Sequence, residues 1–263
     1  MTSKYLAREE APIECDTWKM LEAAMVEVAR NVLAGRRLLD VEGPYGFGLK
    51  SMPLEDVELQ QDLFASAALP VPSIQVGFML GKRDLAAYER DGLPPNLKPL
   101  IDATIRAAEL EDTLILKGAS HLWGLLSVKG SKTQSLSPWS ELGDAAGDII
   151  NAVTALDSAG YHGPYVVALA PTRYNLLLRR HPAGNLSELE HLQTIAAAGV
   201  FKAPVLDKGG VIVNAGRQYA SIVLGQDMNV SFIGPTKESL EFSVGESLAL
   251  FVRQPGAICA LTE

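Results

Sequence analysis

The sequence predicts an α+β fold, and three observations lead to this prediction. Two stretches near 16–35 and 97–118 carry apolar residues at three- and four-residue spacing, which indicates amphipathic helices. Residues 51–80 include a run that alternates with a period of two, which is typical of extended arms. From residue 143 onward, short helical pieces are followed by a series of strand-like runs. Such grouping of helices and strands is typical of α+β proteins.

The composition is that of a soluble globular protein of one or two domains. The 263 residues are 48% hydrophobic and 21% charged, and the net charge is -8. This charge opposes binding to nucleic acid or to an anionic membrane. No run is long enough for a membrane span, and the first residues lack the apolar region of a secretory signal, so we expect a cytoplasmic protein. Cys15 and Cys259 lie near opposite ends of the chain, which favours two reduced thiols over a disulfide, although a disulfide is an open alternative.

The first helix is predicted to begin at an N-cap formed by Asp16 or Thr17 and to end at Gly35. Its apolar side chains form one stripe. The stripe either packs on the protein's own core or forms a groove for a partner peptide. Its members are Trp18, Leu21, Met25, Val28 and Val32.

Residues 51–80 are predicted to form two extended arms, VELQQDLF and PVPSIQVGFML, around a turn of small residues. A ten-residue arm reaches about 33 Å, whereas the radius of gyration of a compact chain of this length is about 18 Å. A straight hairpin would therefore extend beyond its own domain. It either folds back on its own core or pairs with a neighbouring subunit, and we favour the second interpretation.

The second long helix, LKPLIDATIRAAELEDTLILKG, is predicted to be the spine of a domain and to end at Gly118. Glu109, Glu111 and Asp112 interrupt its apolar side. Three clustered acids are predicted to be a solvated face or to pair with arginine across an interface. Residues 126–142 lose periodicity and are rich in Ser, Gly and Pro, which indicates a crossing between domains.

The second half is predicted to contain helices near 144–158, after Pro171 and over 187–198, and a strand over 165–170. The last third adds five further strand-like runs. These runs are VIVN, ASIVLG, NVSFIG, LEFSV and SLALFVR.

No pattern in the sequence indicates catalysis, so we predict no catalytic residue and no metal site. Only His191 stands in a metal-like spacing, Glu188-x-x-His191, and a di-iron site needs two such helices. Gly43 and Gly48 have the spacing of a nucleotide-binding loop, but Leu49 separates Gly48 from Lys50, so a turn is favoured over a phosphate cradle. The function is then expected to lie in binding surfaces.

Several longer motifs, read together, resemble an encapsulin shell protein of the family 1 type. They are GRRLLDVEGPYGFG at 35–48, AELEDTLILKG at 108–118, GLLSV at 124–128, GPYVVAL at 163–169 and LGQDM at 224–228. Their order and spacing match across almost the whole chain. The resemblance implies a bacteriophage major-capsid-like fold of the Hong Kong 97 type, with a P-domain, an E-loop and an A-domain.

The resemblance also implies a domain division. Residues 1–50 form the N-terminal helix and part of the P-domain, 51–80 the E-loop, 81–139 the P-domain with its spine helix, and 140–222 the A-domain. Residues 223–263 return to the P-domain. Under this division the glycine-rich stretch is the turn between the N-terminal helix and the E-loop.

In the family a cargo enzyme carries a short targeting peptide that lies against the N-terminal helix and neighbouring P-domain elements. The resemblance implies eight binding residues here. Leu21, Val28 and Leu33 would make apolar contacts, Arg36 and Asp40 polar contacts, and Met228, Val230 and Phe232 would form the other wall.

The family's five-fold pore is lined by the tip of the A-domain, and the matching loop here is HPAGNL, which is His181, Pro182, Ala183, Gly184, Asn185 and Leu186. The alternative is an ordinary surface loop. Some relatives bind flavin through a tryptophan just after the E-loop. The corresponding stretch here is Gly81-Lys82-Arg83-Asp84, so we expect no flavin and no other cofactor.

The resemblance implies a homo-oligomeric icosahedral shell, of the smallest class, in the cytoplasm. Its partner would be a peroxidase or a ferritin-like cargo enzyme, which links the shell to oxidative stress or iron storage, and neither nucleic acid nor a membrane would bind. The alternative function is a phage or prophage capsid subunit that packages nucleic acid. Because a genome-filled interior favours basic walls, the net charge of -8 favours the enzyme container.

Overall fold

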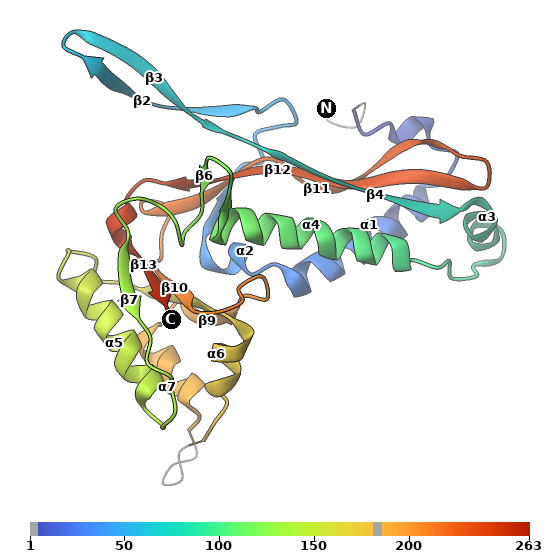
Figure 1. Cartoon of the computed structure of the whole chain (residues 1–263). Coiled ribbons are helices and arrows are strands. Elements are labelled where there is room, and N and C mark those ends of the chain that lie inside the picture. Colours follow the sequence, from blue (N-terminus) through green and yellow to red (C-terminus); the bar gives the residue numbers. More distant parts are fainter. Residues whose placement is uncertain (1–4, 181–185) are drawn as a thin grey trace. The chain divides into compact units, whose positions relative to one another are not determined.

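The chain in the computed structural model divides into two compact units, each built from segments that are distant in the sequence (Figure 1). The structure describes residues 5–180 and 186–263. Unit 1 comprises Met1–Val32, Glu42–Glu111 and Val223–Ala249, and unit 2 comprises Leu33–Val41, Asp112–Ile222 and Leu250–Glu263.

The described helices and strands follow the mixed order that the sequence predicts. The helices are α1 (Cys15–Val32), α2 (Gly35–Leu38), α3 (Lys82–Asp91), α4 (Lys98–Leu116), α5 (Asp144–Asp157), α6 (Pro171–Leu176) and α7 (Glu188–Ile195). The strands are β1 (Asp40–Glu42), β2 (Ser51–Gln60), β3 (Leu63–Pro70), β4 (Ser73–Gly81), β5 (Gly118–Ala119), β6 (Leu122–Trp123), β7 (Lys132–Ser135), β8 (Tyr165–Leu169), β9 (Gly199–Lys202), β10 (Gly210–Asn214), β11 (Ala220–Pro235), β12 (Ser239–Val252) and β13 (Ile258–Thr262).

An aromatic cluster holds α1 of unit 1 on its sheet, whose strand order is β1-β11-β12-β4. The Phe242 ring of β12 stacks on Phe78 of β4 at 5.5 Å between centroids. Trp18 of α1 and Phe232 of β11 meet the same ring edge-on, at 5.8 and 5.6 Å. Each such pair contributes about 0.5–1.5 kcal/mol beyond its buried area. The apolar stripe of α1 therefore packs mainly on the protein's own core.

The N-terminus of α1 is held by a carboxylate from α3, a helix that the sequence did not predict. The Glu89 carboxylate accepts hydrogen bonds from the backbone N–H of Glu14 (2.8 Å) and from the hydroxyl of Thr17 (2.7 Å). Helix α1 begins at Cys15, so the predicted N-cap at Asp16 or Thr17 was wrong. A carboxylate distant in sequence thus binds the chain at the start of α1.

The extended arm is a hairpin of β2 and β3, and its second strand differs from the prediction. The turn lies at Gln61 and Asp62, and Asp62 has a left-handed φ of 63°. The strand β4, predicted as the second arm, instead pairs antiparallel with β12, from Ser73 opposite Ser247 to Gly81 opposite Ser239. The strong alternation of β4 reflects one buried face in a sheet, whereas β3 is exposed at every second residue.

Strands β11 and β12 are each continuous where the sequence predicted two strands. The predicted breaks at Gln226 to Met228 and at Gly245 to Glu246 lie inside strands of 16 and 14 residues. Ser247 explains why a glycine stands at 225, because a Cβ there would lie 2.5 Å from its hydroxyl oxygen. Here glycine marks a close contact and not a turn.

Two of the three acids of α4 are buried, so the prediction of a solvated face was wrong for them. Glu111 and Asp112 have no exposed surface. The Asp112 carboxylate accepts hydrogen bonds from the backbone N–H groups of Ala34 and Gly35, each at 2.8 Å, and so caps the N-terminus of α2. A Cβ at Gly35 would lie 2.6 Å from the Ile115 side chain, so this glycine permits a close approach. Glu109 does lie on the surface, beside Arg106 at 3.5 Å.

Unit 2 is built on a five-stranded sheet of order β7-β13-β10-β8-β9. The buried residues of α5 and α7 share one core cluster with this sheet. The Asp148 carboxylate of α5 accepts from the backbone N–H and hydroxyl of Ser137 and from the indole N–H of Trp139, at 2.7 to 2.9 Å. The stretch predicted as a domain crossing is thereby fixed against α5.

Strand β13 lies between β7 and β10 in this sheet, so Leu250–Glu263 group with unit 2. The domain division by resemblance assigns these residues to the P-domain, and that division stays a prediction. The glycine-rich stretch is a loop that leads into β2. The N–H groups of Tyr45 and Gly46 donate to the carbonyls of Leu224 and Gly225 at 2.9 and 2.6 Å, and no helix follows.

We predict that Asp112→Asn lowers the free energy of unfolding by about 1–3 kcal/mol, because an amide presents its NH2 group to backbone donors that need an acceptor. Urea unfolding followed by circular dichroism measures this. The control is Asp102→Asn in the same helix, whose side chain is 58% exposed, and its effect should stay within about 0.5 kcal/mol. Equal effects of both variants would contradict the capping role.

We predict that iodoacetamide at pH 8 leaves Cys259 unmodified in the folded protein. Both cysteines are free, and burial raises the pKa of the Cys259 thiol to about 11. The reactive thiolate is then scarce as well as inaccessible. Peptide mass spectrometry should detect the label on Cys259 only after unfolding in urea, and exposed Cys15 reports on reagent activity. A label on Cys259 in the folded protein would refute the prediction.

Candidate functional site

The exposed side of α1 offers a small apolar surface bordered by charges of both signs. Ala23 and Val26 stand one turn apart, and the Val26 side chain is 39% exposed. They line a shallow open groove together with Glu22, Glu27, Arg30 and Asn31. Arg8 pairs with Glu22 and lies over the Trp18 ring, 5.1 Å from its centroid. An extended peptide with a small apolar side chain fits such a surface.

The eight residues predicted for peptide binding differ in their exposure. Leu21, Leu33, Val230 and Phe232 are buried in the protein's own core. Val28, Arg36 and Met228 are half-buried, and Asp40 is exposed. Leu33, Arg36 and Asp40 belong to unit 2 and the other five to unit 1. Four of the eight are thus covered by intrachain contacts, and a peptide role for the eight stays a prediction.

Alternation along the strand explains why the predicted residues of β11 are covered. Val230 and Phe232 point into the core, and successive side chains of a strand point to opposite faces. Asn229 and Ser231 are therefore directed to the other face, where they line a cavity. The motif LGQDM located the strand correctly, but the sequence did not tell which of its faces is exposed.

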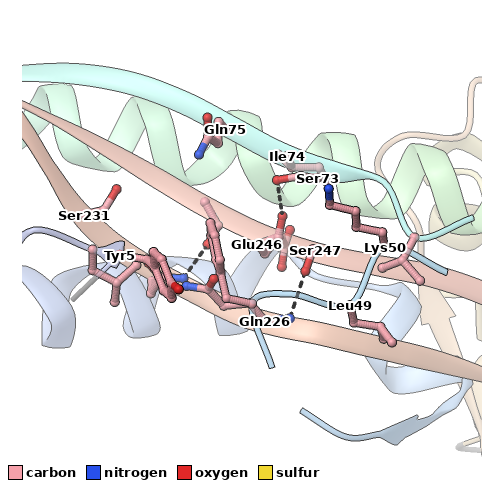
Figure 2. A pocket seen from close by; sticks show the side chains of 15 residues that line it. Tyr5, Leu49, Lys50, Ser73, Ile74, Gln75, Gln226, Ser231, Glu246 and Ser247 are labelled. Carbon is pink, nitrogen blue, oxygen red and sulfur yellow. Dashed lines mark hydrogen bonds between the residues drawn. The ribbon is translucent and has the colours of Figure 1, made fainter. Parts of the chain in front are cut away.

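This cavity has a volume of about 250 Å³ and lies among β4, β11, β12 and the loop before β2, as Figure 2 shows. Its lining includes polar side chains, among them Lys50 and the buried Glu246. The N–H of Gln226 donates to the Ser247 hydroxyl at 2.9 Å, and the Asn229 amide donates to the Gly245 carbonyl at 2.9 Å. Much of the polar lining is thus used to join neighbouring strands.

Four exposed apolar side chains gather at the tip of the β2–β3 hairpin. The exposed fractions are 51% for Val57, 64% for Leu59, 47% for Leu63 and 60% for Phe64. Glu58 lies directly opposite Phe64 in the ladder. Apolar side chains gathered at an exposed edge are typical of a protein–protein contact.

The predicted pore loop has a well-defined base. His181, Pro182, Ala183, Gly184 and Asn185 lie outside the described residues, and Leu186 is exposed. The Arg179 guanidinium pairs with the buried Glu188 at 2.9 Å, and Glu188 also accepts from the N–H of Gly143 at 2.8 Å. Arg180 and Ser187 form a β-bridge. The two residues that flank the loop are thereby held side by side.

The first turn of α7 adds to this base through a capping box. Ser187 accepts from the N–H of Glu190, and the Glu190 carboxylate accepts from the Ser187 N–H at 2.6 Å and hydroxyl at 2.7 Å. These hydrogen bonds lower the pKa of Glu190. The carboxylate therefore stays ionised in mildly acidic solution, where it continues to accept both bonds.

The described residues contain no group of three His, Cys, Asp or Glu side chains placed to hold a metal. Glu188, the acid of the Glu-x-x-His spacing, is engaged by Arg179 instead. Lys82, in the stretch considered for flavin, begins α3 and donates to the Thr236 carbonyl at 2.5 Å. Among the described helices, none has the length and apolar character of a membrane span.

The sequence pattern did not identify two exposed features, the Ala23–Val26 surface of α1 and Trp123 on β6, which is 52% exposed. For α1, a signal was present in the sequence. Ala23 and Val26 lie between the members of the buried stripe, so their i, i+3 spacing on the opposite side could have identified them. For Trp123, no pattern separates an exposed tryptophan from a buried one.

Comparisons with known proteins give the same family along nearly the whole chain. The family model described as "Encapsulating protein for peroxidase" (Linocin_M18) matches residues 3–249. The type 1 encapsulin shell protein EncA of Myxococcus xanthus is 30% identical, with 98% of this chain and 96% of that protein covered. A diheme-cytochrome–encapsulin shell fusion protein of Kuenenia stuttgartiensis is 27% identical over 96% of this chain and 74% of its own length.

A further relative is also a fusion, the ferritin-like–encapsulin shell fusion protein of Pyrococcus furiosus. It is 27% identical, with 73% of this chain and 52% of that protein covered.

Solved structures confirm the predicted capsid-like fold class. The virus-like particle from Pyrococcus furiosus matches with a TM-score of 0.75 at 22% identity, covering 93% of this chain and 99% of that chain. The capsid of Myoviridae phage XM1 matches with a TM-score of 0.58 at 16% identity, covering 85% and 89%. The family match, the identity to EncA and this fold together show that the chain belongs to the encapsulin family of shell proteins.

Proposed function

We propose that copies of this chain close into a shell around a cargo enzyme, with the β2–β3 hairpin as the clasp between neighbouring copies. The observation that carries this proposal is the exposed apolar tip of the hairpin, Val57, Leu59, Leu63 and Phe64. An isolated two-stranded hairpin is marginally stable in water. Contacts repeated around symmetry axes would cover every tip at once.

The cargo is an enzyme held on the inner surface by a short targeting peptide. Two relatives support this class of partner, because their names describe fusions of a shell protein with a diheme cytochrome and with a ferritin-like protein. The description of the family model names a peroxidase. A peroxidase or ferritin-like cargo would link the shell to oxidative stress or to iron storage.

The peptide would lie along the exposed side of α1, where Ala23 and Val26 offer apolar contacts and Glu22, Glu27 and Arg30 offer charged ones. Half-buried Val28 and Met228 and polar Arg36 and Asp40 remain candidates from the family resemblance. Leu21, Leu33, Val230 and Phe232, also candidates from the family resemblance, are buried in the protein's own core. This arrangement separates the side that binds cargo from the side that holds the fold.

The loop 181–186 would form a pore rim for small solutes, held at its base by Arg179 and Glu188. We further propose the smallest icosahedral class, a cytoplasmic location and neither a nucleic acid nor a cofactor such as flavin as partner. The alternative, a capsid that packages nucleic acid, shares the fold. The net charge of -8 favours a protein cargo, because polyanions bind to basic walls.

We predict that Leu59→Ser combined with Phe64→Ser prevents the formation of large particles, because the tip loses the apolar area that would be buried between copies. Size-exclusion chromatography and negative-stain imaging measure assembly. The control combines Ile150→Ser with Leu178→Ser, two side chains that are 46% and 55% exposed in unit 2, and it should assemble normally.

A hairpin variant that assembles as well as this control would show that the hairpin is not the clasp. If particles of the unaltered chain hold nucleic acid instead of an enzyme, the capsid alternative replaces the container.

We predict that Val26→Asp lowers cargo loading at least tenfold while shells still form, because a carboxylate cannot occupy the apolar contact without losing its hydration. The measurement is the cargo-to-shell ratio in purified particles by mass spectrometry. Ile150→Asp, at a similarly exposed apolar residue of α5, is the control. Unchanged loading in Val26→Asp particles would remove α1 from the site.

A further inference from the structure

The β2–β3 hairpin carries charge of one sign. Residues 51–81 contain four acids, Glu55, Asp56, Glu58 and Asp62, and no lysine, arginine or histidine. All four acids are exposed. The carboxylate of Asp56 accepts from the Ser66 hydroxyl at 2.8 Å, within the hairpin itself. A surface that receives this hairpin would therefore need to be basic as well as apolar.

Near the tip, the ladder brings an acid and an aromatic ring together. Glu58 of β2 lies directly opposite Phe64 of β3, and residues opposite one another in a ladder share one face. Both side chains are exposed. This face of the hairpin presents a carboxylate beside an aromatic ring.

Residues 113–140 have the opposite charge and an exposed aromatic side chain. Residues 113–140 contain no acid and three lysines, Lys117, Lys129 and Lys132. Within it, β5 and β6 form a two-stranded ladder that presents Trp123 with 52% of its surface exposed. The Lys129 ammonium lies over the Trp123 ring, 5.3 Å from its centroid. This surface presents an ammonium group beside an aromatic ring.

The Trp123–Lys129 surface has a rigid support. A Cβ on Gly118, which has a φ of 81°, would lie 2.3 Å from the Leu122 carbonyl oxygen, so β5 and β6 are in close contact. The N–H groups of Leu125 and Leu126 donate to the carbonyls of Ile115 and Leu116 at 2.9 Å, which ties the segment to the end of α4. Lys117 is engaged by Asp207 at 2.9 Å, which leaves Lys129 and Lys132 as the lysines of the segment that can meet an incoming acid.

We propose that the hairpin of one copy docks on the Trp123–Lys129 surface of a second copy, with Phe64 against Trp123 and Glu58 against Lys129. The proposal rests on the proposed shell, because it names the surface on which the clasp closes. We infer the hairpin as the docked segment from charge complementarity. The hairpin combines exposed acids with exposed apolar side chains, and the receiving segment has the opposite charge. Aromatic pairing supplies contact area, and the charges fix the register.

Charge exchange between the two surfaces tests the proposal. Glu58→Lys alone and Lys129→Glu alone should each reduce the fraction of chain in large particles at least tenfold at low ionic strength, with a smaller loss in high salt. The double variant in one chain should restore assembly, because each contact again joins opposite charges. Analytical ultracentrifugation measures the fraction assembled, and circular dichroism confirms that each variant is folded.

Co-expression of the two single variants as separate chains distinguishes a contact between copies from a contact within one chain. Contacts between unlike chains again join opposite charges, so part of the lost assembly should return. A contact within one chain would give no recovery on co-expression, which would overturn the proposal. As a control, the Glu58→Lys chain is co-expressed with a Glu58→Lys chain that also carries Lys98→Glu, at a lysine that pairs with Asp102 in α4. This mixture should not recover, because every contact still places a lysine against Lys129.

Tryptophan emission supplies a second measurement that does not depend on charge variants. Trp18 and Trp139 are buried, so the exposed Trp123 should dominate any change in emission on assembly. Assembly of the unaltered chain should shift the emission to shorter wavelength, and Trp123→Phe should abolish the shift. No shift on assembly would overturn the proposed contact.

Two different outcomes would separate an error in the docking surface from an error in the proposed shell. If the unaltered chain forms particles but neither charge exchange nor emission responds, the shell stands and this docking surface is wrong. If the unaltered chain stays a single folded species of 28.2 kDa, the proposed function fails as well.

Discussion

Assembly depends on one constraint, which is that a two-stranded hairpin has no interior. Strand β4 buries Ile74, Phe78 and Leu80 because β12 and the aromatic cluster cover one of its faces. Among the described strands, β2 and β3 pair only with each other, and apolar side chains at their tip remain exposed. In unit 1, the chain's own side chains bury the apolar face of β4. The apolar tip of the hairpin can be buried only by contact with another molecule. A shell of identical copies meets this need without a second gene product.

The same separation of faces organises the surface where cargo would bind. On α1, Trp18 and Leu21 are buried, whereas Ala23 and Val26 are exposed. On β11, Val230 and Phe232 are buried and Asn229 lines a cavity. A substitution on the exposed side can therefore change binding without creating a cavity in the core. The family motifs contain buried and exposed residues alike, so a resemblance alone does not tell which residues are exposed.

The sequence predicted the elements whose periodicity is set by one buried face, which are α1, α4, α5 and the alternating strand β4. It failed where long-range contacts decide. The weak pattern of β3 gave no sign of pairing with β2. The gap predicted after Gly225 lies inside β11, where the Ser247 hydroxyl of β12 approaches the glycine too closely for a side chain. The sequence predicted a solvated Asp112, because the backbone groups that bind it lie 77 and 78 residues away along the chain. Of the candidate site, the sequence located the helix and strand but not their exposed faces.

Acidic residues have two different roles in this chain, and their hydrogen-bond partners show which residue has which role. Asp112 caps α2, whereas Asp148 and Glu188 accept from the backbone N–H groups of Ser137 and Gly143 and so fix the segment between β7 and α5. Glu58 on the hairpin faces solvent and meets no such donor in the ladder. Its charge is available to another molecule, which is why a single net charge for the chain understates how strongly the hairpin can select a basic partner.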